Sequence, residues 1–191
     1  QLGGTIDYLE RDGFPPLRVH PTGIAGGQAT MNGAKTSQYF SSLTIAAACA
    51  KTDVTIFCSD EMSEKPYFDI TVDMMRRFGV EAQNDSYKTI DVKAGQKYRA
   101  TDIDVESDFS SASYFFAAAA ITGAKLFLRG LQEFSVQGDR KIVDYARAMG
   151  CSLGWRDGGI EVTGGDVRPI DETFFDTPDL VPTVAVMAAF A

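Results

Sequence analysis

Apolar positions along the chain follow two patterns, one typical of strands and one typical of helices. Residues 53–58 alternate and are rich in β-branched side chains, which predicts a strand. Residues 69–78 carry apolar side chains at helical spacing, and Gly79 follows as a natural helix end. The segment 114–121 is apolar all round, so we expect a buried helix there. These patterns predict an α/β protein.

The same order of elements occurs twice, which indicates an internal repeat. Each copy is expected to read strand, helix, strand, helix, strand, strand, with a period of about seventy residues, longer than solenoid repeats. Such a unit buries little apolar surface alone, so several are expected to pack with helices inward and sheets outward. The matching positions are Tyr39 with Tyr114, Gly79 with Gly150, Ile90 with Ile160, Val92 with Val162 and Gly95 with Gly165.

This repeat divides the chain into four predicted parts. Residues 1–23 are the tail of a preceding unit, and residues 24–104 are a complete unit of a first domain. Residues 105–165 form a unit of a second domain, and residues 166–191 start a further unit. The linker 100–104 is the expected crossing between the domains. The chain has no initiator methionine and opens within a pattern, so we expect a fragment of a longer protein.

Lys35-Thr36-Ser37-Gln38 begins the first predicted helix, which we expect to run to about Ala50. Thr36 or Ser37 can act as the N-cap, and the remaining free N–H groups favour an anion such as phosphate. A plain helix cap is the alternative interpretation. Four other loops enter helices with similar polar residues: Ser63–Tyr67, Thr177–Asp179, Ser110–Ser113 and Ser135–Asp139.

Two other side chains, Asp179 and Tyr67, each allow two interpretations. Asp179 lies in the first turn of an apolar helix, where a carboxylate is either a cap or a general base. Tyr67 is either a core aromatic residue or a ring that packs against a substrate. The pair Asp139 and Arg140 has one expected interpretation, Asp139 as a cap and Arg140 as a solvated charge.

Charge and cysteine content narrow the function classes. A formal charge of −8 and a pI of about 4.6 argue against general binding of nucleic acid or anionic membranes. The three cysteines lack CxxC spacing and predict a reducing, cytoplasmic location, with Cys49 and Cys58 packed in the core. The chain shows no metal-ligand spacing, Gly-rich dinucleotide loop or P-loop, and no apolar run long enough to span a bilayer.

Six motifs in register make the chain similar to the EPSP synthase (3-phosphoshikimate 1-carboxyvinyltransferase) family. They occur in family order and spacing across nearly the whole chain. The motifs are Lys35–Tyr39, Lys65–Thr71, Phe78–Val80, Val105–Phe115, Ser135–Asp139 and Pro178–Leu180.

The resemblance implies a fold, a reaction and roles for particular residues. The fold is two domains of repeated βαβαββ units, an inside-out α/β barrel of which this chain holds part. The reaction transfers the enolpyruvyl group of phosphoenolpyruvate to the 5-hydroxyl of shikimate 3-phosphate, without a metal or organic cofactor. Thr36 and Ser37 would hold the substrate phosphate, and Gln38 would contact the substrates. Tyr67 would pack on the shikimate ring, and Asp179 would accept the proton of the 5-hydroxyl.

The chain departs from the family pattern in ways that affect this expectation. The family usually has serine at Thr36, and the hydroxyl survives. Its third phosphate-binding serine falls on Glu64, so either Ser63 substitutes through a shifted loop or phosphate binding is weakened. The family's lysines and arginines for phosphoenolpyruvate come from stretches absent here. We therefore expect negligible transferase activity from the isolated chain. A full-length protein is expected to be a monomer.

Two other functions compete with this interpretation. The sister enolpyruvyl transferase acting on UDP-N-acetylglucosamine typically uses a cysteine in a mobile loop, and none of Cys49, Cys58 or Cys151 is expected in an exposed loop. A non-catalytic binding module with a decayed site is the second alternative. Glu64 and the missing cations favour it, whereas the retained Ser37, Gln38, Tyr67 and Asp179 oppose it.

Overall fold

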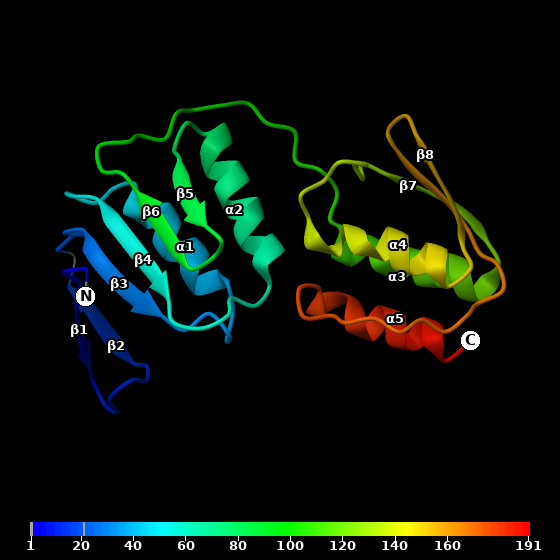
Figure 1. Ribbon diagram of the computed structural model, residues 1–191, viewed down its shortest axis with the longest axis horizontal. Helices are drawn as coiled ribbons and strands as arrows, with labels where there is room; N and C mark the ends of the chain where they lie inside the picture. Colours follow the sequence, from blue (N-terminus) through cyan, green and yellow to red (C-terminus); the bar gives the residue numbers. More distant parts are fainter. Residues whose placement is uncertain (1, 21) are drawn as a thin grey trace. The chain divides into compact units, whose positions relative to one another are not determined.

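The computed structural model describes residues 2–20 and 22–191 (Figure 1). The chain divides into two compact units, one ending at Thr101 and the other beginning at Asp102. This division lies inside the predicted linker, residues 100–104. The finer boundaries of the repeat units stay predictions.

Unit 1 contains one complete strand-helix-strand-helix-strand-strand module. Its sheet has the order β3-β4-β6-β5, in which β3 is parallel to β4 and the other pairs are antiparallel. Helices and sheet bury a common core that includes Val54 and Ile56 of β4. The elements are β3 (Gly27–Met31), α1 (Gln38–Ala47), β4 (Val54–Cys58), α2 (Lys65–Arg77), β5 (Ala82–Asp85) and β6 (Thr89–Val92). A separate hairpin, β1 (Thr5–Tyr8) and β2 (Leu17–His20), precedes them.

The first helix ends earlier than the sequence predicts. α1 ends at Ala47, with a turn in place of the expected continuation to about Ala50. Cys49 lies in that turn and is exposed, so the prediction that it packs in the core is wrong. Its apolar alanine neighbours suggested a buried helix, but the chain leaves the helix before reaching it. Cys58, at the end of β4, is buried as predicted.

Unit 2 repeats the module without its first strand. Its sheet has the order β7-β9-β8 and is antiparallel throughout. Ser107 donates its amide to the Gly130 carbonyl beside β7, but residues 102–106 form no strand. The elements are α3 (Phe109–Thr122), β7 (Lys125–Arg129), η1 (Gly138–Lys141), α4 (Ile142–Ala148), β8 (Ser152–Arg156), β9 (Gly159–Thr163), η2 (Pro178–Leu180) and α5 (Val181–Ala188).

α3 is apolar all round but is buried on only one side. Phe109 and Phe116 are fully buried in the core of unit 2, whereas Tyr114 is 65% and Phe115 56% exposed. The expectation that the whole helix is buried is therefore wrong for this face, because α5, α4 and the sheet cover only the opposite side.

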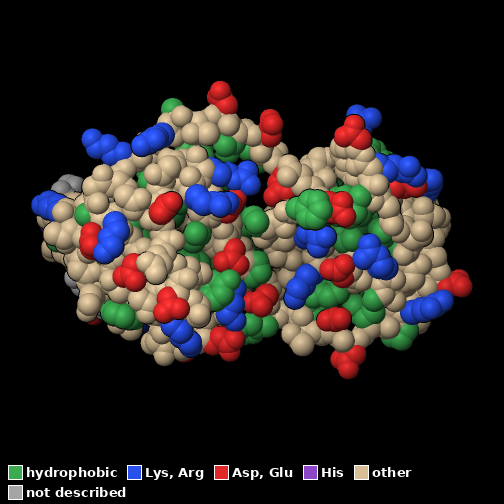
Figure 2. Space-filling model, turned by 45° about the horizontal axis from the view of Figure 1, so that its top comes forward, with side chains coloured by type: hydrophobic (Ala, Val, Ile, Leu, Met, Phe, Trp, Pro, Cys, Tyr) green, Lys and Arg blue, Asp and Glu red, His purple; other side chains and the backbone are tan. Residues whose placement is uncertain are grey.

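Charges of both signs intermingle on the surface. Figure 2 shows lysine, arginine, aspartate and glutamate side chains interspersed over the visible face, with no continuous basic field. None of the helices in the described part of the chain is long and apolar enough to cross a membrane.

Candidate functional site

Two helix-entry loops of unit 1 lie in contact, although they are far apart in the sequence. The first leads into α1 and the second into α2. Thr36 Oγ1 donates to Glu64 Oε2 at 2.9 Å, across a separation of 28 residues. Ser63 Oγ donates to the Gly33 carbonyl at 3.1 Å. The structure thus brings together Thr36, Ser37 and the Ser63–Tyr67 loop, which the sequence singled out separately.

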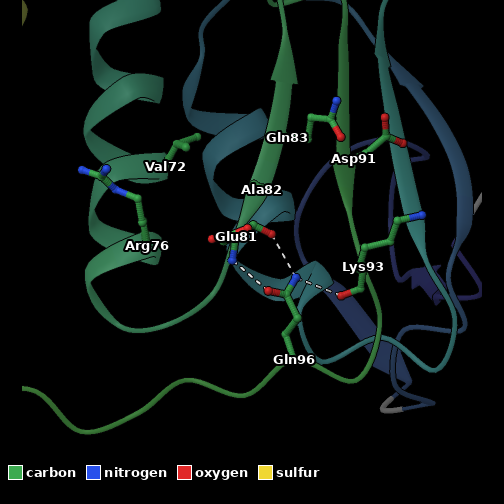
Figure 3. A pocket seen from close by; sticks show the side chains of 8 residues that line it. All are labelled: Val72, Arg76, Glu81, Ala82, Gln83, Asp91, Lys93 and Gln96. Carbon is green, nitrogen blue, oxygen red and sulfur yellow. Dashed lines mark hydrogen bonds between the residues drawn. The ribbon is translucent and has the colours of Figure 1, made fainter.

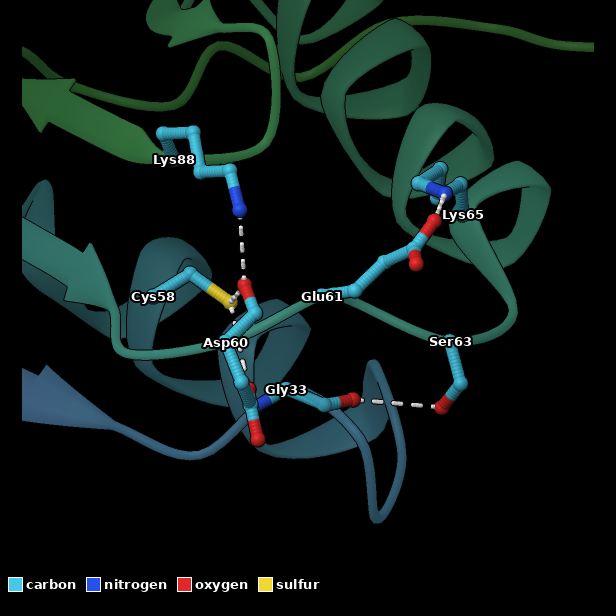
Figure 4. A network of polar contacts seen from close by, with 7 residues as sticks. All are labelled: Gly33, Cys58, Asp60, Glu61, Ser63, Lys65 and Lys88. Atoms are coloured by element: carbon cyan, nitrogen blue, oxygen red, sulfur yellow. Dashed lines mark hydrogen bonds and ion pairs between the residues drawn. The ribbon is translucent and has the colours of Figure 1, made fainter.

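Gly33 makes this close approach possible. A Cβ atom at this position would lie 2.5 Å from Cys58 Sγ and 2.8 Å from Met62 Cα, so no other residue fits without displacing the second loop. The Gly33 amide donates to Asp60 Oδ1 at 2.6 Å (Figure 4). The Gly33 backbone thus holds the two loops together through hydrogen bonds with Asp60 and Ser63.

Further polar contacts anchor the second loop. Lys65 Nζ donates to Glu61 Oε1 at 2.9 Å, and Lys88 Nζ donates to the Asp60 carbonyl at 3.0 Å (Figure 4). The hydrogen bond and positive charge of Lys65 lower the pKa of Glu61, and Lys88 adds to this effect. Both lysines thus tie the loop to neighbouring elements of unit 1.

The start of α1 has one capping hydroxyl and one enclosed hydroxyl. Thr36 Oγ1 accepts from the Gln38 amide at 3.2 Å, so Thr36 caps a backbone donor of the first turn. Ser37 occupies the N-cap position without a side-chain cap bond. Its Oγ atom is fully buried and has no hydrogen-bond partner among the described residues, which is unusual for a buried polar atom. Gln38 is exposed.

The start of α2 places a carboxylate next to a hydroxyl-bearing residue, Glu64 after Ser63. Glu64 is the N-cap residue in a left-handed conformation with φ of 55°, and Pro66 lies in the first turn. Tyr67 is partly buried. Ser63 is buried against Gly33, whereas the Glu64 carboxylate reaches Thr36. Of the two residues that the sequence left open, Glu64 is therefore the one that contacts the Thr36 hydroxyl.

Asp179 belongs to unit 2. It is exposed and lies within η2, where Thr177 and not Asp179 is the N-cap residue. It borders a hollow of about 280 Å³. The other residues that line this hollow are Ser110, Ser111, Tyr114, Pro178 and Pro182.

The helix starts of unit 2 use their hydroxyls internally. Ser110 Oγ donates to Asp139 Oδ2, and Ser135 Oγ donates to Glu106 at 2.9 Å. Asp139 is only 2% exposed and lies in the first turn of η1, whose N-cap residue is Gln137, so it does not occupy the cap position that the sequence predicts. The contact with Ser110, 29 residues away, explains how the carboxylate is accommodated, and sequence patterning gave no signal for it.

A larger hollow in unit 1 contains none of the predicted site residues (Figure 3). It measures about 640 Å³ and lies beside the edge strand β5. Its two cations already have acidic partners, since Arg76 pairs with Asp73 at 2.6 Å and Lys93 with Asp53 at 2.9 Å. Gln96 bridges the backbone amide and carbonyl of Glu81. The hollow is therefore a weaker candidate than the paired loops.

No candidate metal site is found in the part of the chain that the structure describes. Residues 2–20 and 22–191 contain no group of three or more His, Cys, Asp or Glu side chains placed to hold a metal ion.

Comparisons with known proteins match the whole chain. The model of the EPSP synthase (3-phosphoshikimate 1-carboxyvinyltransferase) family matches residues 1–191. A 3-phosphoshikimate 1-carboxyvinyltransferase of Shewanella amazonensis is 42% identical over 192 residues, and one of Serratia proteamaculans is 43% identical. Each alignment covers 100% of this chain and 45% of the relative, so the chain spans under half the length of these curated relatives.

Solved structures show the same fold. An EPSP synthase structure from Acinetobacter baumannii superposes with a TM-score of 0.72 at 23% sequence identity. The match covers 95% of this chain and 42% of that chain. The predicted fold class, part of an enolpyruvyl transferase fold, is confirmed.

Proposed function

The chain belongs to the EPSP synthase family, and from this premise we propose that it carries the shikimate 3-phosphate side of an enolpyruvyl transferase site. The overall reaction joins the enolpyruvyl group of phosphoenolpyruvate to the 5-hydroxyl of shikimate 3-phosphate and releases inorganic phosphate. The sister transferase acting on UDP-N-acetylglucosamine is disfavoured by the names of the relatives.

The contact between the two helix-entry loops of unit 1 carries this proposal. Thr36 and Glu64 meet at 2.9 Å, which brings the α1 start and the Ser63–Tyr67 loop to one place. Hydroxyls and first-turn amides at a helix start suit a phosphate, because they donate hydrogen bonds at the positive end of the helix dipole. Thr36 and Ser37 would hold the phosphate and Gln38 would bind the substrate, while Tyr67 would pack on the ring.

Asp179 would supply the proton acceptor. In the proposed reaction the 5-hydroxyl oxygen adds to carbon two of phosphoenolpyruvate, carbon three gains a proton, and Asp179 takes the hydroxyl proton. The tetrahedral intermediate then loses a proton from carbon three and expels phosphate, which restores the enol ether. Asp179 is exposed, as a group that must meet a substrate should be.

Ser63 would act on the same site by holding the second loop. Its hydroxyl is hydrogen-bonded to Gly33, so we propose that it keeps Tyr67 in place and does not itself reach the phosphate. A non-catalytic binding module is the second candidate function, and the Glu64 carboxylate on Thr36 is the observation that favours it.

Calorimetry with shikimate 3-phosphate tests the proposal. The 191-residue chain is expected to bind the ligand, and Ser37→Ala is expected to weaken binding at least about tenfold, since hydrogen bonds to charged groups contribute about 1.5–3 kcal/mol. Ser42→Ala is the matched control, because Ser42 is an exposed serine further along α1 that bonds only the Tyr39 carbonyl among described contacts. No binding, or equal weakening by both variants, would contradict the proposal. The isolated chain is expected to show negligible turnover.

A further inference from the structure

The hydroxyl of Thr36 is already engaged by a carboxylate of the same chain. Thr36 Oγ1 donates to Glu64 Oε2 at 2.9 Å and accepts from the Gln38 amide at 3.2 Å. A threonine hydroxyl has one proton to donate. It therefore cannot donate to a bound phosphate while Glu64 holds that proton.

The carboxylate lies where an external anion would be most favoured. Through Thr36, Glu64 is linked to a first-turn amide at the start of α1, the positive end of the helix dipole. The carboxylate uses the Thr36 hydroxyl, a donor that a phosphate oxygen would also use. A second, doubly charged anion at this place would meet both a used hydroxyl and a like charge.

The loop holds Glu64 in this position. Its φ of 55° is uncommon for a residue other than glycine, so the surrounding contacts must maintain it. On one side Ser63 is tied to Gly33, and Gly33 is tied to Asp60 (Figure 4). On the other side α2 begins at Lys65, whose ammonium donates to Glu61.

We propose that Glu64 is a specificity-determining residue whose carboxylate occupies, as an internal anion, the phosphate-binding site proposed at Thr36 and Ser37. The inference rests on the proposed function, because it concerns the same phosphate-binding site. A phosphate-bearing ligand must displace the Glu64 carboxylate from Thr36 before it binds. Glu64 thereby lowers the affinity of this chain for phosphate monoesters relative to a chain with a hydroxyl at this position.

A purely structural role for Glu64 makes a different prediction. In unit 2 the equivalent loops are also joined by a carboxylate and a hydroxyl, Glu106 and Ser135 at 2.9 Å. If Glu64 only clasps the loops, its replacement would loosen them and would not improve anion binding. The two roles therefore differ in the sign of their effect on phosphate affinity.

Titration of the 191-residue chain with inorganic phosphate, followed by the NMR shifts of the Thr36, Ser37 and Gln38 amides, separates these roles. Glu64→Ser is expected to bind phosphate at least about tenfold more tightly than the unmodified chain, a factor equal to about 1.4 kcal/mol. Glu64→Gln keeps the side-chain length and removes the charge, so an intermediate gain in phosphate affinity is expected. If Glu64→Ser does not fold, the result for Glu64→Gln distinguishes the two roles of Glu64. Glu81→Ser removes one negative charge elsewhere in unit 1 and is expected to change the affinity less than about twofold.

Each contrary result has a distinct meaning. Equal and measurable phosphate binding by the unmodified chain and both Glu64 variants would overturn the role of Glu64. The proposed phosphate-binding site would still stand. Equal gains in the Glu64 variants and Glu81→Ser would also overturn it, because net charge alone would then explain the effect. Absence of phosphate binding in every variant would overturn both this inference and the phosphate-binding part of the proposed function.

Discussion

Acidic side chains at the helix starts do three different things in this chain. Asp108 caps α3 by accepting from two backbone amides, Asp139 is buried against Ser110, and Glu64 contacts Thr36 on another helix start. All three occupy positions that look alike in the sequence, next to hydroxyl-rich turns. Their roles differ because their partners come from different loops, which only the folded chain brings together.

Replacing Asp108 with alanine tests the cap at the residue scale. Asp108 accepts from the Ser110 and Ser111 amides, each at 3.0 Å, and from Ser111 Oγ at 2.6 Å. Asp108→Ala should lower the free energy of unfolding of unit 2 by about 1 kcal/mol, measured by urea denaturation at neutral pH. Asp104→Ala is the control, because Asp104 is an exposed carboxylate nearby without a described partner.

The effect of Asp108 should depend on pH in a defined direction. Partial burial alone would raise the pKa of Asp108, but the hydrogen bonds from Ser111 and Ser110 outweigh it and hold the pKa below the ordinary value of 3.8. A depressed pKa in the folded state gives stability that is present above the ordinary pKa and is lost as pH falls through the folded one. The deficit of Asp108→Ala should therefore shrink below about pH 3.8. A deficit that stays constant down to pH 2 would contradict an ionised cap.

Residue types revealed part of the candidate site, but contacts across loops remained hidden. The run Lys35–Gln38 identified a helix start able to bind an anion, and the structure places Thr36 as a cap there. The Thr36–Glu64 contact could not be predicted, because it joins residues 28 apart through the packing of Gly33 against Cys58 and Met62. A glycine in a loop gives no sequence signal of which partner it approaches.

At the scale of elements, periodicity was a good guide to existence and a poorer guide to burial. The strand predicted at residues 53–58 is present as β4, and the helix predicted at 69–78 is present as α2, starting four residues earlier at Lys65. The apolar run of α3 forms a helix, but its Tyr114 face is exposed. Apolar content indicates that a face can be buried, whereas burial itself depends on neighbours that this segment does not specify.

The close packing of the two loops of unit 1 can be tested with one added methyl group. Gly33→Ala would place a Cβ 2.5 Å from Cys58 Sγ and 2.8 Å from the Met62 backbone, so the loop 59–64 must shift. We expect a loss of about 1–3 kcal/mol in the stability of unit 1, measured by urea denaturation. Gly4→Ala is the matched control, because nothing lies within 4 Å of a Cβ there. Equal effects of the two substitutions would show that the loops do not pack as described.

At the scale of the whole chain, the two units have separate cores. The buried cluster of unit 1 includes Phe40, Ile56 and Phe68, and that of unit 2 includes Phe109, Phe116 and Ile160. The two clusters share no member among the described residues. Contacts within each unit can therefore be broken without direct loss of the other core.

Separate cores predict separate loss of stability. Ile56 is fully buried in the middle of the unit 1 sheet, so Ile56→Ala should leave a cavity and lower the stability of that unit by about 2–5 kcal/mol. Native-state hydrogen exchange should then quicken for the β4 and β6 amides and stay unchanged for the β8 and β9 amides. Ile160→Ala, an equally buried isoleucine of unit 2, should give the reverse pattern. If either substitution quickened exchange to the same degree in both sheets, the chain would unfold as one cooperative body in spite of its two cores.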